Sequence, residues 1–408
     1  MRTPDLNWIK DPRVFQVNRL QAYSDHIYTI GKDKKPSSFS LNGTWKFNLS
    51  KNYDSCFKFF YNTEFNDSNW NDIQVPGHIQ LQGFDNPHYT DVTYPWDGHD
   101  VVKPGQIDMD KNKVYQYRKT FDCPQDFIGN KLILSFEGAE SNIYVWLNGK
   151  FIGYAEDSFT PSRFDITKYT QEKDNVLCVR IFQKCTGTWL EDQDMWRFTG
   201  IFRDVMIYKQ PSLHIQDLKI DTDIDLDTNK SVLSCICKMS NNESHTLQAK
   251  LYDPQGNIVW NGNMQDTFEI PVENTCLWSS EFPNLYQLEL VLYDTNNEII
   301  ETIQEQVGFR KFTLEYGIMK LNGKRIVFHG INRHEWDPKT GRCLSQEQME
   351  EDIHILKSLN INAVRTSHYP NNSYWYKLCD QYGIYVIDEM NLETHGVNDI
   401  LPQNKTEW

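Results

Sequence analysis

Glutamate and histidine side chains that could do chemistry lie near the C-terminal end of this 408-residue sequence. Glu393 and His395 are two residues apart in "NLETHG", which follows the apolar run "YGIYVIDEM". Carboxylate and imidazole groups can transfer protons or bind a metal ion. A Glu-x-His pair at a strand end therefore indicates half of a reactive site, although the same pair could also be a solvated strand end.

Further reactive side chains precede this pair. "HGINRHEWDP" contains His334, and "NAVRTSHYPN" contains Arg365 and His368. Far upstream, "WLEDQDMWR" places Asp192 and Asp194 between tryptophans. Aromatic faces stack on pyranose rings and carboxylates accept hydrogen bonds from hydroxyl groups, so this mixture suits sugar binding. The alternatives are an acidic surface turn for the two aspartates and structural roles for the histidines.

The C-terminal reactive residues follow a repeating pattern of strands and helices. The apolar periodicity predicts, in alternating order, three strands and two helices over residues 324–333, 345–360, 362–367, 373–383 and 384–391. Ser345 and Gln348 form a capping-box pair, and Gly383 suits a helix C-cap. Such repeats imply parallel strands, and His334 and His368 then point into one mouth at the strand ends, as in a (β/α)8 barrel.

The upstream sequence consists of short β segments. Residues 39–210 contain a hairpin with an Asn-Gly turn at 148–149 and predict a β-sandwich. Residues 211–311 have the strand spacing of an immunoglobulin-like sandwich. With an N-terminal arm at 1–38 and the strand–helix region at 312–408, the predicted fold class is multidomain β plus α/β.

The composition argues against some classes of binding partner and indicates the cellular compartment. The net charge of −15 argues against nucleic acid and anionic membranes as partners. No segment reads as a signal peptide or a membrane span. The nine cysteines include no CxxC motif, and Cys235 and Cys237 alternate with Ile236 on one strand face. This is typical of free thiols, and we expect a cytoplasmic protein.

Several stretches in order along nearly the whole chain resemble glycoside hydrolase family 2: "GTWKF", "YTDVTYPW", "LEDQDMWRFTGIFRDV", "HGINRHEWDP", "NAVRTSHYPN" and "LCDQYGIYVIDEMNLETHG". The match is closest to the bacterial β-galactosidases of this family, including the large subunit of the two-chain type. The resemblance implies a jelly-roll-like β-sandwich, an immunoglobulin-like β-sandwich and the first three β/α units of a TIM barrel. It also implies hydrolysis of terminal β-D-galactosides such as lactose, by an oligomer to which a small second subunit could belong.

The resemblance also implies residue roles in binding. Glu393 and His395 match magnesium ligands, and Asp194 matches the residue that binds the galactose 6-hydroxyl and a sodium ion. Asp91 stands where many relatives have a substrate-binding asparagine. An ionised carboxylate only accepts hydrogen bonds, whereas an amide also donates them, so a sugar contact at Asp91 stays open.

The implied catalytic set is incomplete. His334 and His368 match histidines that support the transition state, and Arg365 matches an arginine that steadies the nucleophile. Retaining glycosidases also need two carboxyl groups about 5 to 5.5 Å apart, and the family carries them after the fourth and seventh barrel strands. Neither stretch occurs in the 408 residues, and Glu389 and Glu393 match the third strand instead. We therefore expect the N-terminal portion of a longer enzyme, inactive by itself.

Two other functions stay open. One is a β-glucuronidase of the same family, and the other is a carbohydrate-binding fragment that cleaves nothing. Asp194 argues against the glucuronidase, because its charge would repel the 6-carboxylate of a glucuronide. The sequence beyond Trp408 would separate an enzyme from a binding fragment.

Overall fold

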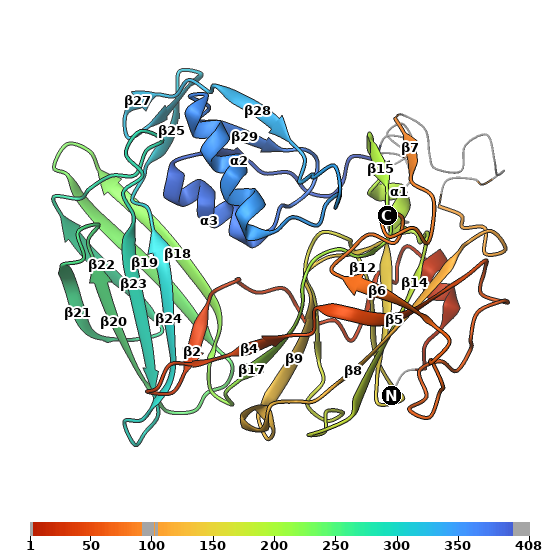
Figure 1. The fold of residues 1–408 in the computed structure, drawn as a ribbon. Helices are drawn as coiled ribbons and strands as arrows, with labels where there is room; N and C mark the ends of the chain where they lie inside the picture. The colour runs from red at the N-terminus through yellow and green to blue at the C-terminus, as the bar shows by residue number, and fades with distance from the viewer. Residues whose placement is uncertain (1–2, 92–101, 103–104, 395–408) are drawn as a thin grey trace.

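The computed structural model describes residues 3–91, 102 and 105–394. Two β-sandwiches lie next to each other, and a smaller α/β unit lies against both of them (Figure 1). His395, which the sequence analysis assigned to a metal site, lies outside the described residues. Three parallel strands with two helices follow the two sandwiches, so the predicted combination of β-sandwiches with the start of a TIM barrel is confirmed.

The first sandwich has two main sheets around one apolar core. The larger sheet has the order β1 (Gln16–Val17), β12 (Lys150–Glu156), β11 (Asn142–Leu147), β14 (Asn175–Phe182), β8 (Val114–Phe121), β5 (Gly43–Ser50) and β6 (Asn71–Val75). The smaller sheet has the order β13 (Ser162–Asp165), β9 (Lys131–Phe136), β17 (Val205–Gln210) and β4 (Ser38–Ser40). Asn148 and Gly149 have φ angles of 50° and 76°, which is the left-handed backbone that the predicted hairpin turn requires.

Short elements of the first sandwich carry its loops. The pair β7 (His88–Thr90) and β15 (Met195–Arg197) is antiparallel, as is the pair β10 (Ala139–Glu140) and β16 (Gly200–Ile201). Its described residues also include three short helical segments: η1 (Leu6–Lys10), η2 (Gln125–Phe127) and α1 (Gly187–Leu190).

The second sandwich also has two sheets. One has the order β18 (Ile215–Asp225), β19 (Lys230–Met239) and β22 (Thr267–Glu273). The other has the order β21 (Ile258–Met264), β20 (Thr246–Tyr252), β23 (Tyr286–Tyr293), β24 (Ile299–Val307), β2 (Tyr28–Ile30) and β3 (Lys35–Pro36). The N-terminal segment therefore joins the two sandwiches, because β1 extends a sheet of the first and β2 and β3 extend a sheet of the second (Figure 1).

The α/β unit contains a small antiparallel sheet and a parallel sheet. The former consists of β25 (Phe312–Glu315), β26 (Ile318–Leu321) and β27 (Lys324–Arg325). The latter consists of β28 (Gly330–Arg333), β29 (Ala363–Thr366) and β30 (Tyr385–Ile387), connected by α2 (Gln346–Ser358) and α3 (Ser373–Tyr382). Both helices pack on one face of the parallel sheet through a shared apolar core.

Local signals for these helices are confirmed. The capping box of Ser345 and Gln348 is present at the start of α2. Gly383 ends α3 with a left-handed φ of 71°. A Cβ atom at position 383 would lie 2.5 Å from the Ser280 carbonyl oxygen, so both the backbone angle and the contact with the second sandwich require glycine.

One strand prediction was wrong. Residues 324–333 were expected to form one continuous buried strand, but they divide into β27 and β28, with residues 326–329 outside both. The first three residues of β28 are exposed. Among the described residues β28 pairs only with β29, so it is an edge strand and lacks the second neighbour that would bury it.

Candidate active site at the strand ends

The parallel register places the reactive residues at one edge of the sheet. Asn332 of β28 is level with Arg365 of β29, and Arg365 is level with Ile387 of β30. His334, His368 and Glu389 lie one or two residues after the last residues of these three strands, at their carboxyl ends. Because parallel strands run in the same direction, side chains from distant parts of the chain meet at this edge.

Glu389 connects two of the predicted site residues. Its Oε1 accepts a hydrogen bond from Arg365 Nε, and its Oε2 lies 2.6 Å from His368 Nδ1. Arg365 Nη1 also donates to Asn332 Oδ1 at 3.4 Å. Partial burial raises the pKa of Glu389, but the hydrogen bonds and charges of His368 and Arg365 outweigh it, and the pKa falls below its usual value. The Glu389 carboxylate is therefore charged at neutral pH.

The two predicted histidines lie together, beside Glu393. The His334 and His368 rings are perpendicular with centroids 6.0 Å apart. His368 Nε2 lies 3.6 Å from Glu393 Oε1. Burial lowers the pKa of His334, and the nearby His368 and arginines lower it further. The negative charge of Asp194 raises this pKa but does not outweigh the other effects. His334 is therefore largely neutral at pH 7, a form in which it donates one hydrogen bond and accepts another.

The first sandwich brings Asp194 to the same place. Tyr89 of β7 donates a hydrogen bond from its hydroxyl to Asp194 Oδ1. Asp194 is exposed, and so are its aromatic neighbours Tyr89 and Trp196, whose ring centroids are 5.5 Å apart. An exposed carboxylate beside exposed aromatic faces is the arrangement that a sugar ring and its hydroxyl groups require.

Asp192 has a different role from Asp194. Its side chain is fully buried and forms an ion pair of 2.6 Å with Arg197. Asp91 follows β7. The hydrogen bond to Asp194 is the main reason why the pKa of Tyr89 is raised, and the charge of Asp91 adds to this effect. Asp192 thus belongs to the framework, whereas Asp91 lies at the margin of the candidate site.

Two contacts hold the β30 loop against the first sandwich. Gln193 Nε2 donates to Asn391 Oδ1 at 3.2 Å, and the Thr394 backbone N–H donates to the Leu190 carbonyl at 3.2 Å. Because these contacts flank Glu393, they bring it beside the loop that carries Asp194. The structure therefore gathers five of the seven predicted residues at the seam of two domains: His334, Arg365, His368, Glu393 and Asp194.

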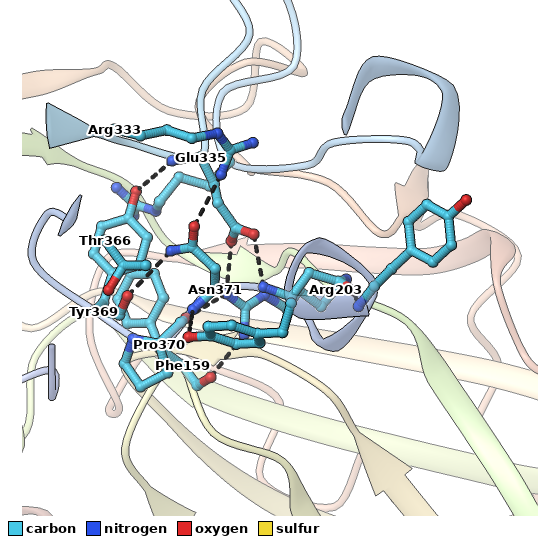
Figure 2. A network of polar contacts seen from close by, with 12 residues as sticks. Phe159, Arg203, Arg333, Glu335, Thr366, Tyr369, Pro370 and Asn371 are labelled. Atoms are coloured by element: carbon cyan, nitrogen blue, oxygen red, sulfur yellow. Dashed lines mark hydrogen bonds and ion pairs between the residues drawn. The ribbon is translucent and has the colours of Figure 1, made fainter. Parts of the chain in front are cut away.

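A buried ionic network fixes this seam (Figure 2). Arg203 of the first sandwich forms an ion pair of 2.7 Å with Glu335, which follows His334. Arg203 also donates to the carbonyls of Phe159 and Pro370, and Glu335 accepts from the Asn372 backbone N–H at 2.6 Å. This pair could not be predicted from the sequence, because neither residue type nor spacing distinguishes it from a pair of surface charges.

Sequence reasoning also missed Tyr89 and the role of Glu389. Tyr89 stands two residues before Asp91, so side-chain alternation in an extended segment could have drawn attention to it. Glu389 lies at a strand end, but the sequence cannot indicate that both of its oxygens are engaged.

The described residues do not form a metal site by themselves. Within that part of the chain, no group of three or more His, Cys, Asp or Glu side chains is placed to hold a metal ion. Of the two predicted magnesium ligands, only Glu393 is described. No helix among the described residues is long and apolar enough to cross a membrane.

Three family models match consecutive parts of the chain. They are described as the sugar binding domain of glycosyl hydrolases family 2 at residues 39–211, glycosyl hydrolases family 2 at 213–310, and the TIM barrel domain of that family at 312–408. Solved structures agree in fold: 91% of the chain superposes on 61% of a β-glucuronidase from Ruminococcus gnavus with a TM-score of 0.73 and 21% identity. A β-glycosidase from Bacteroides vulgatus gives a TM-score of 0.70, with 23% identity over 86% of the chain and 44% of that protein.

Curated relatives are more similar in sequence. A β-galactosidase of Halalkalibacterium halodurans is 48% identical over 99% of the chain and 41% of its own length. A β-galactosidase large subunit of Lactobacillus acidophilus is 39% identical over 99% of the chain and 69% of its own length. The chain thus spans less than half of the full-length β-galactosidase and about two thirds of the large subunit. With three family models in order and a relative matched over most of its length, the chain belongs to glycosyl hydrolases family 2.

Proposed function

We propose that this chain is the sugar-binding and N-terminal catalytic part of a β-galactosidase that hydrolyses terminal β-D-galactosides, including lactose, with retention. One observation carries the proposal: the loop of Asp194, which Tyr89 holds, is hydrogen-bonded on both sides of Glu393 and so lies across the domain seam from the two histidines. A galactose between them would meet acceptors on one side and imidazole groups on the other. Relatives named β-galactosidase, at 38–48% identity, support the same specificity.

The charge at Asp194 supports a galactoside over a glucuronide. A carboxylate accepts a hydrogen bond from a 6-hydroxyl, but it would repel a 6-carboxylate at the same distance. The solved β-glucuronidase, at 21% identity, shares the fold and carries no argument about substrate.

The two reacting carboxyl groups come from residues beyond those described. Glu389 is unsuited to either role, because Arg365 and His368 engage both of its oxygens. A general acid needs a raised pKa, and that of Glu389 is lowered. His334, His368 and Arg365 then bind the sugar and support the transition state, while the acid/base and the nucleophile approach from the remaining barrel strands.

We also propose magnesium as a cofactor, with Glu393 and His395 as ligands, and sodium at Asp194. Magnesium prefers six oxygen-rich ligands and usually keeps several waters, so water molecules or a further carboxylate would complete its site. In the complete enzyme, Glu393→Gln should raise the magnesium concentration needed for half-maximal activity. An unchanged magnesium requirement would remove Glu393 from the site.

Assembly and location are parts of the same proposal. The relatives from Leuconostoc lactis and Lactobacillus acidophilus are named large subunits, which supports an enzyme of more than one subunit. All nine cysteines are free thiols and seven of them are buried, as in proteins of a reducing cytoplasm.

Turnover of nitrophenyl glycosides by the complete enzyme tests the proposal. We expect hydrolysis of the β-galactoside, with β-galactose as first product, and much slower hydrolysis of the β-glucuronide. A preference for the glucuronide would overturn the proposed specificity, and sugar binding without any hydrolysis would favour the carbohydrate-binding fragment.

A further inference from the structure

Glu389 is hydrogen-bonded to two site residues of the neighbouring strand. Arg365 and His368 both come from the end of β29, and Glu389 receives one hydrogen bond from each. Its side chain keeps 23% of its exposure, so solvent reaches the pair only in part. Hydrogen bonds to a charged, partly desolvated carboxylate are stronger than those between neutral groups, and this bridge therefore restrains both side chains.

The backbone of Glu389 is restrained as well. Its N–H donates to Thr366 Oγ1 at 3.0 Å, and Thr366 is completely buried. The Thr366 hydroxyl in turn donates to Asp388 Oδ1 at 3.1 Å, and the Tyr376 hydroxyl donates to the same oxygen at 2.5 Å. The carboxylate is thus presented from an anchored segment that directly follows β30, which is what precise orientation of a neighbouring ring requires.

The bridge also determines which nitrogen of His368 faces the site. A charged carboxylate only accepts hydrogen bonds, so the His368 nitrogen next to it, Nδ1, has to carry a hydrogen. Nε2 is then the nitrogen that faces Glu393 and the mouth formed by the strand ends. A sugar hydroxyl placed there would meet a ring of fixed orientation.

We propose that Glu389 is a positioning residue for the hydrolysis. It fixes the ring orientation and the tautomer of His368 and does not itself contact the sugar. The inference rests on the proposed function, because it assigns Glu389 a role in the same galactoside site. It differs from a catalytic role in that both carboxylate oxygens are used within the protein.

Substitution of Glu389 in the complete enzyme tests the inference. Glu389→Gln keeps the shape but replaces one acceptor by an N–H donor, which allows the opposite tautomer of His368. We expect kcat for nitrophenyl β-galactoside to fall about ten- to a hundredfold, the size of a lost charged hydrogen bond, with a smaller change in KM. Affinity for a galactose-derived lactam should fall more than affinity for a thiogalactoside, because only the former imitates the transition state.

A double-mutant cycle with His368→Asn separates positioning from general damage. If Glu389 acts through His368, Glu389→Gln should lower kcat clearly less in the His368→Asn enzyme than in the wild type, although its bond to Arg365 is changed in both. Glu350→Gln is the matched control. The Glu350 carboxylate of α2 accepts a hydrogen bond from the Tyr374 hydroxyl of α3, so it too is bonded to a side chain that carries a ring. This control should keep wild-type kinetics. If Glu389→Gln does not fold, Glu389→Asp, which keeps the charge and withdraws it by one methylene group, replaces it in the cycle.

Additive losses in the cycle, or wild-type kcat in the Glu389 variant, would overturn the inference. A loss of thermal stability with equal weakening of lactam and thiogalactoside binding would also overturn it, since that is the pattern of a merely structural residue. If the unmodified complete enzyme does not hydrolyse galactosides, the proposed function fails instead, and the two failures are distinguishable.

Discussion

The first sandwich and the α/β unit differ in how their sheets are covered. In the sandwich, two sheets enclose one continuous apolar core, and Trp45 and Phe47 are almost completely inaccessible to solvent. In the α/β unit, α2 and α3 cover one face of the parallel sheet. At its far edge, Ile387 and Met390 keep 51% and 73% of their exposure. One region therefore encloses its core between two sheets, whereas the other, within the described residues, has apolar side chains exposed along its parallel sheet.

This difference explains why the site lies on the seam. The α/β unit is held by contacts with its neighbours, such as the buried Arg203–Glu335 pair on one side. On the other side, Trp278 Nε1 of the second sandwich donates to the Asp380 carbonyl at 2.8 Å. The sandwich supplies Asp194, which Tyr89 contacts, and the α/β unit supplies His334 and His368 from strand ends whose position depends on docking. The candidate site therefore needs both regions.

The largest expected effect concerns the catalytic activity of the 408-residue chain alone. We expect its turnover of nitrophenyl β-galactoside to equal that of a denatured control. Loss of general acid catalysis costs about 10²- to 10⁴-fold, and the covalent route is lost as well. Purification from a host without β-galactosidase is the control. Genuine turnover by this chain would mean that the α/β unit, too, is self-sufficient.

The next largest effect concerns docking of the α/β unit. Glu335→Gln leaves the Arg203 charge buried and unpaired, which typically costs about 3 to 5 kcal/mol. Urea unfolding should show this loss, and limited proteolysis should then leave a core that ends near Lys311.

Two variants sharpen the docking test. Asp352→Asn removes a half-exposed partner of Arg333 and should cost at most about 1 kcal/mol. The double variant Arg203→Met with Glu335→Met should lose less stability than Glu335→Gln, because no charge stays buried. Equal stability of Glu335→Gln and the wild type would refute the view that this pair fixes the seam.

Substitutions of Asp194 and Asp192 in the first sandwich should have smaller effects, and the two should differ in kind. In the complete enzyme, Asp194→Asn should lower kcat/KM about ten- to a hundredfold, the equivalent of about 1.5 to 3 kcal/mol, with little change in stability. Asp192→Asn should instead mainly destabilise the fold, because it breaks the buried ion pair with Arg197. Kinetics and thermal unfolding of both variants decide the matter; unchanged kinetics and an unchanged sodium response for Asp194→Asn would exclude it from the site.

The remaining effect is a pH dependence of stability in the second sandwich. Burial raises the pKa of Glu301 to about 8, against the opposing hydrogen bond from the Ile215 backbone N–H. The folded chain holds this proton more tightly than the unfolded chain, whose value is near 4.5. The stability contribution is thus complete below pH 4.5 and is lost as the pH rises through about 8.

Glu301→Gln should remove this slope, which is at most about 1.4 kcal/mol per pH unit for one proton. Urea unfolding of both proteins from pH 4.5 to 8.5 measures it. Glu269→Gln, at an exposed position of β22, is the control and should keep the wild-type slope. Parallel curves for the wild type and Glu301→Gln would show that Glu301 does not titrate in this range.

Local structure could be predicted from the sequence wherever a few neighbouring residues determine it. The Ser345–Gln348 capping box, the Gly383 cap and the Asn148-Gly149 turn depend on backbone angles and hydrogen bonds within four residues, so the sequence contains all that forms them. The strand-end positions of His334 and His368 followed in the same way from alternating strands and helices.

Only the tertiary structure decided what these residues meet. Whether Asp194 lies near enough to act on His334, whether Arg203 is buried with Glu335, and whether Glu389 holds His368 all depend on how surfaces far apart in the sequence pack together. The sequence thus determined the family, the elements and the residues that could react. Packing determined which charges lose their water and find a partner, because desolvation depends on all surrounding groups and on no local pattern.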